Sequence, residues 1–479
     1  MRSHPGKRLA AVALALLAAV TGLTQTASAA RPSNTATSHA ASAPAAAAPN
    51  LQVWGNQLVD AGTGRAFQMR GVNKMMFDWG CVTKDNAADG IHFDPWNKDT
   101  SMATTIQTLR DWHVNTVRIP LNVSCLRGWH DSQHPEYELP WNAQANPPGQ
   151  HVYDHIAYRN AVYDYVTSLT DAGFAVVLSQ HLSENFPDSA FLKTTCAKEQ
   201  VGLDPNSAVC PKVLPNMGSS VEFWTDVAGM FGQNKAVTFD LFNEPRAAEA
   251  MNAGTGTVDE RDAAAWKCLV EGGPANCAGQ PSAGLRQLLK AVRDAGADNV
   301  VIAEGNGWGD LLNHWLDSWA PGKSAPPPNL MASIHVYEQD DCGERPDQST
   351  ECYYNPWPDM AAVAAKVPLL IGEFGNGHYV KVQDDPEKWD AYCTWHKLLP
   401  NGTRDPLTFS EHLMDWADGG NDAHVTAGYL AWTFNQSFNS DVCHDDQPNK
   451  VHQLVTDDFL GTPTAFGQLV HDHLAAVAP

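Results

Sequence analysis

The chain has 479 residues, and its 54 acidic side chains outnumber the 31 basic ones, which gives a formal net charge of −23 and a pI of about 5.1. Nucleic acids and anionic membranes bind basic surfaces, so this charge argues against both as partners. A neutral ligand is compatible with it.

The first 29 residues predict a secretory signal peptide. A basic segment at residues 1–8 precedes an apolar stretch at residues 9–20, and Ala27-Ser28-Ala29 forms a small-residue cleavage site. The apolar stretch is too short to span a bilayer, and no later segment is long enough either. We therefore expect cleavage near Ala29 and a secreted, extracellular protein.

Residues 30–49 consist largely of Ala, Ser, Thr and Pro, which predicts a disordered linker. An Ala-rich helix is the alternative, and the three prolines of this stretch disfavour it. Residues 50–479 are too few for three ordinary domains and contain no second linker. One domain enlarged by loops is the simplest organisation, and we expect a monomer.

The chain contains ten cysteines, and together with an export signal this makes disulfide bonds the default expectation. Sequence alone does not fix the connectivity. Pairing of neighbours along the chain would join Cys81–Cys125, Cys196–Cys210, Cys268–Cys277, Cys342–Cys352 and Cys393–Cys443. A metal site would need cysteines or histidines at ligand spacing, which the chain lacks, so no metal or organic cofactor is predicted.

Helix and strand patterns alternate along the predicted domain. Apolar side chains at helical spacing, as in residues 102–109, 162–169 and 285–292, precede short runs rich in β-branched residues. Strands that are apolar on both faces and alternate with helices predict a parallel sheet. The predicted strands are Ala66–Val72, Thr116–Ile119, Ala175–Ser179, Ala236–Phe242, Val300–Ala303, Leu330–Val336, Leu369–Ile371 and Gly428–Thr433.

These strands favour a closed (β/α)8 TIM barrel with long disulfide-linked loops on one face. An open doubly wound sheet is the rival architecture, but it would usually carry a Gly-rich nucleotide loop, and no GxGxxG follows the first strand. Residues 51–60 predict a small hairpin that covers the bottom of the barrel.

Two predicted strands end in a glutamate. Residues 236–242 lead into Asn243-Glu244-Pro245, where the proline stops the strand, and residues 369–371 lead into Gly372-Glu373. Catalytic groups of parallel barrels lie at the carboxyl ends of the strands. Two carboxyl groups at such positions are what acid-assisted cleavage of a glycoside requires. For either glutamate alone, a buried ion pair or a helix cap is the alternative.

A set of short motifs occurs at strands 1, 2, 4, 6, 7 and 8. They are Arg70-Gly71-Val72-Asn73, Val117-Arg118-Ile119-Pro120, Asn243-Glu244-Pro245, His335-Val336-Tyr337, Gly372-Glu373-Phe374 and Trp432. In this order the chain resembles glycoside hydrolase family 5, the cellulase-type barrel hydrolases, over nearly everything after Asn50. The resemblance implies that Glu244 is the acid/base and Glu373 the nucleophile of a retaining hydrolase.

Five polar residues are expected to support this pair. Arg118 is expected to reach Glu373 and keep it ionised, although it could simply balance barrel carboxylates. Asn243 is expected to bond the sugar 2-hydroxyl, or else to cap the turn. Tyr337 is expected to orient Glu373. His335 and His181 are expected to line the floor of the site, and a satisfied core histidine is the alternative for each.

Trp432 is expected to stack on a sugar ring, with core packing as the alternative. Four other tryptophans could add contacts, namely Trp79, Trp129, Trp308 and Trp357. Glu304 ends the fifth strand and is interpreted as a possible substrate contact. Long insertions at residues 123–152, 182–218, 246–283 and 338–359 predict a walled pocket at the barrel mouth.

The sequence therefore predicts a secreted retaining hydrolase of β-linked oligo- or polysaccharides, with glucan favoured over mannan. A mannanase or another β-glycosidase of the same family is the first alternative. A carbohydrate-binding protein that has lost catalysis on the same barrel is the second, and the presence of both glutamates disfavours it. The walled mouth could favour exo-action or short substrates over endo-cleavage.

Overall fold

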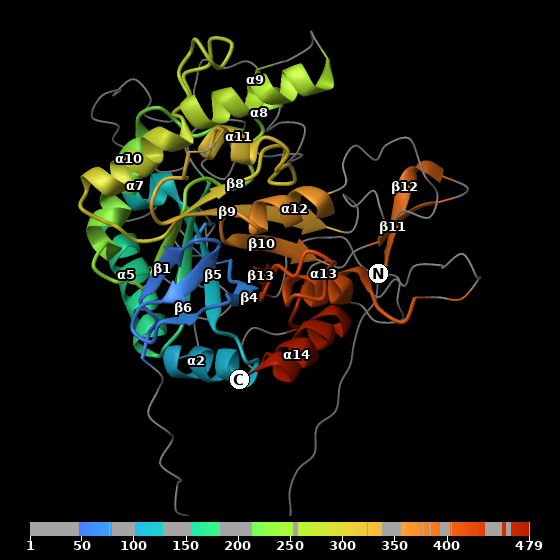
Figure 1. The fold of residues 1–479 in the computed structure, drawn as a ribbon. Coiled ribbons are helices and arrows are strands. Elements are labelled where there is room, and N and C mark those ends of the chain that lie inside the picture. The colour runs from blue at the N-terminus through green and yellow to red at the C-terminus, as the bar shows by residue number, and fades with distance from the viewer. Residues whose placement is uncertain are drawn as a thin grey trace, which may run out of the picture. The chain divides into compact units, whose positions relative to one another are not determined.

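A computed structural model describes the fold (Figure 1). The described residues are 47–75, 77–78, 101–127, 155–182, 213–251, 257–322, 324–337, 356–375, 378–382, 385–392, 403, 405–435, 453–456 and 461–478. They all belong to one compact unit, Ala45–Pro479. The expected signal peptide and nearly all of the expected linker lie outside them, so both stay predictions.

Eight parallel strands close into a barrel in the order β10-β13-β4-β5-β6-β7-β8-β9, which confirms the predicted (β/α)8 fold. Their bounds are β4 Arg70–Asn73, β5 Thr116–Asn122, β6 Ala175–Leu182, β7 Val237–Asp240, β8 Val301–Glu304, β9 Leu330–Tyr337, β10 Leu369–Gly375 and β13 Ala427–Ala431. Every carboxyl end of these strands opens at the same mouth, because all neighbours are parallel.

Each predicted strand differs from the observed one by one to four residues at one or both bounds. Ala66 belongs to β3 (Arg65–Ala66), which pairs antiparallel with β2, and the barrel strand begins only at Arg70. Phe67 and Met69 lie between the two strands and no glycine or proline interrupts them, so pattern alone did not separate the two. The last barrel strand ends at Ala431, so Trp432 and Thr433 follow it at the mouth.

Helices follow most of the strands and surround the barrel in Figure 1. The described helices are α2 Met102–Asp111, α3 Val123–Arg127, α5 His155–Asp171, α7 Ser219–Phe231, α8 Ala247–Ala250, α9 Val258–Glu271, α10 Leu285–Asp294, α11 Trp315–Trp319, α12 Trp357–Ala364, α13 Phe409–Ala417 and α14 Ala465–Val477. Gly173 and Gly296 follow α5 and α10 with φ of 97° and 82°, a conformation that glycine adopts without strain.

Two buried tryptophans fasten helices to the barrel close to the mouth. The indole N–H of Trp224 on α7 donates to the carbonyl of Leu241 at 2.9 Å, just beyond β7. The indole N–H of Trp315 on α11 donates to the carbonyl of Ala303 on β8 at 3.0 Å. Each bond satisfies a buried carbonyl that would otherwise be costly, and so fixes the strand ends from which Glu244 and Glu304 emerge.

The predicted hairpin lies across the bottom of the barrel. Strands β1 (Leu51–Trp54) and β2 (Gln57–Asp60) pair antiparallel, with β3 at the edge. Leu51 and Leu58 are buried in a cluster with inward-facing side chains of the barrel strands, among them Val177, Ile302, Met331, Leu370 and Leu430. Burial of this apolar surface closes the lower end of the barrel.

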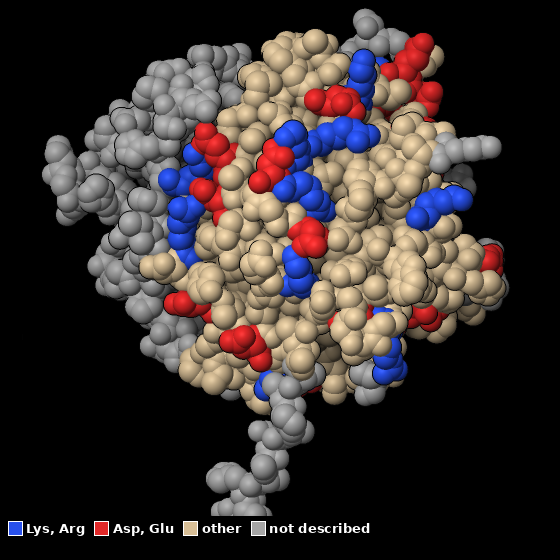
Figure 2. Space-filling model, turned by 60° about the vertical axis from the view of Figure 1, so that its left-hand side comes forward, with Lys and Arg blue, Asp and Glu red and all other residues tan. Residues whose placement is uncertain are grey.

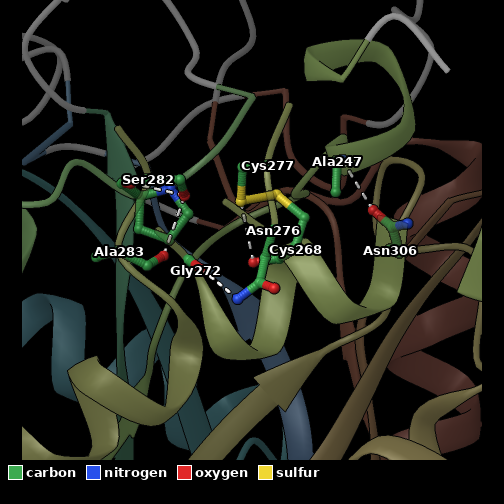
Figure 3. The surroundings of a disulfide bond; sticks show 9 residues. Ala247, Cys268, Gly272, Asn276, Cys277, Ser282, Ala283 and Asn306 are labelled. Atoms are coloured by element: carbon green, nitrogen blue, oxygen red, sulfur yellow. Dashed lines mark hydrogen bonds between the residues drawn. A yellow bond between two sulfur atoms is a disulfide. The ribbon is translucent and has the colours of Figure 1, made fainter. Parts of the chain in front are cut away.

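The insertion after β7 contains α8, α9 and a disulfide bond between Cys268 and Cys277, one of the predicted pairs (Figure 3). The side chain of Asn276 donates to the carbonyl of Gly272 at 2.8 Å beside it. Cys125 is also disulfide-bonded, with a partner outside the described residues. The other predicted pairs, and most of the loops expected to wall the mouth, lie outside them as well.

A second hairpin, β11 (His378–Val382) and β12 (Asp385–Tyr392), follows β10 and extends away from the barrel in Figure 1. It was not predicted, because apolar and polar residues alternate over only three positions in each strand, at residues 380–382 and 389–391, and Pro386 lies in the second strand.

The face drawn in Figure 2 carries basic side chains close beside acidic ones. Surface ion pairs such as Lys290–Asp294, Arg286–Glu271 and Arg159–Asp226 are of this mixed kind. Among the described residues, none of the helices combines the length and the hydropathy that a transmembrane span needs.

Candidate active site

Glu244 and Glu373 lie together at the mouth of the barrel. Glu373 is on β10, and Glu244 follows β7. A carboxylate oxygen of each, together with a ring nitrogen of His335, lies within 4.8 Å of the others. Two side chains that are distant in the sequence therefore face one small space, as the two strand-end motifs predicted.

Glu373 is buried and held on both of its oxygens. Oε1 accepts from Nη1 of Arg118 at 2.6 Å, and Oε2 accepts from the phenol of Tyr337 at 2.9 Å. Its side chain is 4% exposed, so its orientation is fixed by charged and polar donors that water does not reach. Burial raises the pKa of Glu373, while His335 and Arg118 act to lower it.

The contact expected between Arg118 and Glu373 is therefore present. Arg118 lowers the pKa of Glu373 as expected, but burial raises that pKa by more. Sequence reasoning considered only the neighbouring cation. The structure shows that desolvation of a buried carboxylate outweighs that attraction, so the net direction of the pKa shift is upward.

Glu244 is more open to solvent, with 24% of its side chain exposed. Its Oε1 lies 3.0 Å from Nδ1 of His335. The backbone at Glu244 has a φ of 49°, in the left-handed region that a residue with a β-carbon adopts at a cost. Its N–H donates to Oε2 of Glu304 at 2.7 Å, which helps to hold this conformation.

Arg118 lies at the centre of the buried polar groups. Its guanidinium contacts Asp240 at 2.8 Å, Glu304 at 3.0 Å and Glu373 at 2.6 Å. Nη2 also donates to Oδ1 of Asn243 at 2.7 Å. Although burial opposes it, the three carboxylates raise the pKa of Arg118, so the guanidinium is a fixed cation.

Sequence analysis missed Asp240. Its Oδ2 accepts from Nε and Nη2 of Arg118, and its side chain is 1% exposed. Burial, and after it the negative charge of Glu304, raise the pKa of Asp240 to about 7. The signal that could have identified it is a carboxylate at the end of the strand Val237–Asp240, whose other residues are Val, Thr and Phe.

His335 lies between carboxylates. Nδ1 is 3.0 Å from Glu244 and 3.7 Å from Glu373, and Nε2 is 3.2 Å from Glu304. Burial lowers the pKa of His335, but the charges of Glu304 and Glu373 overcome it and raise that pKa well above its ordinary value. Burial, followed by the charge of Glu373, likewise raises the pKa of Tyr337 and keeps its phenol protonated as a donor.

His181 and Trp432 stack on one another. Their ring centroids are 5.7 Å apart and their planes differ by 5°. Nδ1 of His181 has no hydrogen-bond partner among the described residues. Burial and the charge of Arg118 lower the pKa of His181 to about 3, so the ring is neutral and can accept or donate a hydrogen bond to a hydroxyl.

The remaining candidates divide into three cases. Trp308 is 38% exposed, one face of its indole lies 3.8 Å from the Arg246 guanidinium carbon, and its N–H donates to Glu249. Trp357 is half-buried and packs on Trp416 and Phe409, so it belongs to the core. Trp79 and Trp129 lie outside the described residues.

Glu304 was interpreted as a possible substrate contact, and the structure contradicts this. Its side chain is completely buried, with both oxygens engaged by protein groups. A carboxylate at a strand end is exposed only if the following loop leaves it open, and here the loop closes over it.

Glu244, His335 and Glu373 are close enough together to be considered as metal ligands. However, Glu373 already accepts from Arg118 and Tyr337, and a guanidinium this close would repel a cation. The arrangement therefore fits an organic substrate better than a metal ion.

A parallel barrel that presents two neighbouring carboxylates at the carboxyl ends of its strands is the architecture of the barrel glycoside hydrolases. The family model described as "Cellulase (glycosyl hydrolase family 5)" matches residues 62–403. The chain belongs to glycosyl hydrolase family 5, as the motifs indicated, and is a glycosyl hydrolase.

Two relatives, one of them with two solved structures, illustrate the likeness. The β-mannanase/endoglucanase A of Caldicellulosiruptor saccharolyticus is 22% identical over 343 residues, which are 71% of this chain and only 18% of that longer protein. The native β-glucanase of Saccharophagus degradans superimposes with a TM-score of 0.51 at 17% identity, covering 90% of this chain and 94% of its own. Its complex with cellotetraose gives a TM-score of 0.51 at 15% identity with the same coverage.

Proposed function

We propose that this protein is a secreted, monomeric hydrolase that cleaves β-linked glucans with retention of anomeric configuration. Membership of the family supports hydrolysis of a β-glycan. The observation that carries the stereochemical part is the separation of the carboxylates, because oxygens of Glu244 and Glu373 lie within 4.8 Å. Retaining enzymes hold the carboxyl groups about 5–5.5 Å apart, whereas inverting enzymes leave about 6.5–9.5 Å for a water molecule.

In the first step an oxygen of Glu373 attacks the anomeric carbon. The bond between that carbon and the leaving oxygen breaks, and Glu244 gives its proton to this oxygen. In the second step Glu244 takes a proton from water, the water oxygen bonds to the anomeric carbon, and Glu373 is released as a carboxylate. The proton carried by Glu244 is thereby restored.

The environments of the two carboxylates support this division of roles. Glu373 is immobilised by Arg118 and Tyr337, as an attacking atom should be. Glu244 is the more exposed of the two and has one side-chain partner among the described residues, His335, so it can exchange a proton with a leaving group or with water.

A polar network and an aromatic platform support binding of a sugar between the two carboxylates. Asn243 is 7% exposed, its Oδ1 accepts from Arg118, and its side chain also shares a hydrogen bond with His181, so the amide is held in a fixed orientation at the place proposed for a sugar hydroxyl. The stacked rings of His181 and Trp432 offer an apolar surface of the kind on which sugar rings pack.

Glucan is favoured over mannan because the S. degradans β-glucanase, whose fold this chain shares, was solved with cellotetraose. Mannan is the second candidate, because the C. saccharolyticus relative is described as a β-mannanase as well as an endoglucanase. Hydrolysis of cello- and manno-oligosaccharides of defined length would rank the two sugars. Product lengths from a long glucan would distinguish endo- from exo-cleavage.

The central test compares wild type with Glu244→Gln and Glu373→Gln on aryl β-glycosides, with product anomers followed by NMR. We expect the first-formed anomer to retain the substrate configuration. Each variant should lose at least about 10²–10⁴-fold in kcat. Glu271→Gln, which removes an exposed carboxylate on α9, is the matched control and should retain activity. Equal turnover by all four proteins would exclude this pair as the catalytic residues.

A further inference from the structure

Glu304 is a charged side chain in the site that takes no part in the proposed bond-making and proton-transfer steps. It is the last residue of β8, and its side chain is completely inaccessible. The loop after it closes this space at Gly309, whose φ is 84°. A β-carbon on Gly309 would lie 3.1 Å from the His335 ring and 3.4 Å from Oε2 of Glu304. Glycine is therefore required for the loop to pass this close.

The two oxygens of Glu304 have different partners. Oε2 accepts from the backbone N–H of Glu244 at 2.7 Å. Oε1 lies 3.0 Å from Nη2 of Arg118 and 3.2 Å from Nε2 of His335. One carboxylate thus contacts the backbone of the proposed acid/base, the cation that binds the proposed nucleophile and the imidazole that contacts both.

The contact between Glu304 and Glu244 is the first of several that join the segment after β7 to the segment after β8. Beyond it, the N–H of Trp308 donates to the carbonyl of Pro245 at 3.3 Å, and the guanidinium of Arg246 lies over the indole of Trp308. Oδ1 of Asn306 accepts from the N–H of Ala247 at 3.0 Å, as Figure 3 shows. Residues 244–247 are therefore fastened side by side to residues 304–308.

We propose that Glu304 is the positioning residue of the acid/base: it fixes the backbone of Glu244 in its left-handed conformation and orients His335 so that Nδ1 faces the catalytic pair. This inference rests on the proposed retaining mechanism. It replaces the earlier interpretation of Glu304 as a substrate contact with a role exerted through two other residues.

The backbone geometry shows why such a residue is needed. A left-handed conformation is unfavourable for a residue with a β-carbon, and Glu244 adopts it with φ of 49°. A charge-assisted hydrogen bond to its N–H is stronger than a neutral one and offsets that cost. Without the bond, the carboxyl of Glu244 would no longer be held at the position where the leaving oxygen forms.

Asp240 completes the arrangement. Its Oδ1 is buried and has no hydrogen-bond partner within the part of the chain that the structure describes. In the protonated form it donates to Glu304, and this interaction adds to burial in raising its pKa. Glu304 itself stays ionised, because His335 and Arg118 overcome the effect of burial and lower its pKa to about 2.

The experiment measures kcat/KM of wild type and Glu304→Gln on a series of aryl β-glycosides whose leaving groups range from phenol to dinitrophenol. A good leaving group needs no proton, so a misplaced acid should matter only for poor ones. We expect a loss of about 10²-fold or more on the phenyl glycoside and of only a few fold on the dinitrophenyl glycoside. A loss that is the same for all leaving groups would overturn the proposal.

Protonation of His335 provides a second readout that needs no substrate. The groups that face this histidine and Glu304 from the surrounding strands are Arg118, His181, Asp240, Glu244, Tyr337 and Glu373. Because Glu304 contributes a negative charge to this set, Glu304→Gln should lower the pKa of His335, as followed by imidazole ¹⁵N NMR. An unchanged His335 titration would contradict the orienting role.

Two further variants keep the test decisive. Glu304→Asp keeps the charge but is one methylene shorter, so it should steepen the dependence on the leaving group while changing the His335 titration little. Asp418→Asn removes a mostly buried carboxylate that pairs with Arg70 and His473 outside the site, and it should change neither readout. If the same effects appeared in Asp418→Asn, general destabilisation would explain them and the proposal would fail.

The result also separates this inference from the proposed function. If wild type cleaves none of the glycosides but the His335 titration responds to Glu304→Gln, the proposed function is wrong while the contact is real. If wild type cleaves with retention and Glu304→Gln shows neither effect, only the positioning role is wrong.

Discussion

The two ends of the barrel are built from opposite kinds of residue. At the lower end, Leu51 and Leu58 of the hairpin pack on inward-facing Leu370 and Leu430, and the interior is apolar. At the mouth, Arg118 and Asp240 are as deeply buried, but both are charged or titratable. The same eight strands therefore close one end by hydrophobic burial and hold buried charge at the other, which separates stability from chemistry.

Among the changes considered, removal of the Arg118 guanidinium should have the largest effect on stability and on turnover. Arg118→Met would leave Asp240, Glu304 and Glu373 buried without their shared partner. Breaking a buried ion pair by removing one side costs about 3–5 kcal/mol, so we expect a loss of that size in the free energy of unfolding, and no measurable turnover. Urea unfolding and glycoside hydrolysis measure the two effects.

Arg70→Gln is the matched change away from the mouth. Arg70 pairs with Asp418 but is 23% exposed, so its loss should cost roughly 1 kcal/mol and leave turnover unchanged. If Arg118→Met were no more destabilising than Arg70→Gln, the two ends would not differ in the way described.

A truncation in the apolar end should destabilise without impairing chemistry. Leu58→Ala removes a side chain that is 5% exposed, and such changes cost about 2–5 kcal/mol. We expect a lower melting temperature and kcat/KM within a few fold of wild type at 25 °C. Trp54→Ala on the same hairpin, where the side chain is 73% exposed, should change neither quantity much. A large loss of kcat in Leu58→Ala would show that the two ends are coupled.

Counted per pH unit, the smallest effect is expected from the pH dependence of the mouth. The pKa of Asp240 is raised to about 7, so the folded state binds this proton more tightly than the unfolded chain does. Its contribution to stability is complete below the ordinary aspartate pKa of 3.8 and is lost as the pH rises through a pKa of about 7. Asp240→Asn imitates the protonated form, so its stability relative to wild type should improve by on the order of 1 kcal/mol per pH unit between pH 4 and 7.

Thermal unfolding at a series of pH values would measure this difference. Asp418→Asn provides the opposite sign, because His473 and Arg70 overcome burial and lower the pKa of Asp418. Its stabilising contribution is present above the ordinary carboxyl pKa and is lost as the pH falls. Parallel pH profiles for the two variants would mean that the protonation of Asp240 has been assigned wrongly.

The barrel and the proximity of Glu244 to Glu373 were predictable because each depends on a local signal. An apolar run that ends in a carboxylate places Glu244 and Glu373 at strand ends, and closure of the sheet then brings them together. The alternation of helix and strand patterns was sufficient to predict that the strands are parallel. The predicted hairpin also lies where expected, since its apolar positions had only the bottom of the barrel to cover.

The remaining features depend on contacts across the sheet, which a linear pattern does not contain. Asp240 and Glu304 lie on neighbouring strands, and only the register of β7 and β8 shows that they share Arg118. The stacking of His181 on Trp432 joins residues that are far apart in the chain and not on adjacent strands. The direction of the Glu373 pKa shift required its burial, which no spacing rule supplies.

The contacts that join residues 244–247 to residues 304–308 limit which loop exchanges this protein can tolerate. Because Gly309 passes against the His335 ring and Asn306 holds the N–H of Ala247, we expect a different loop after β8 to shift Glu244 and His335 even if that loop never met the sugar. Attempts to redirect specificity by loop exchange should therefore begin at other strands of the barrel, and this segment should be transplanted only together with its partner.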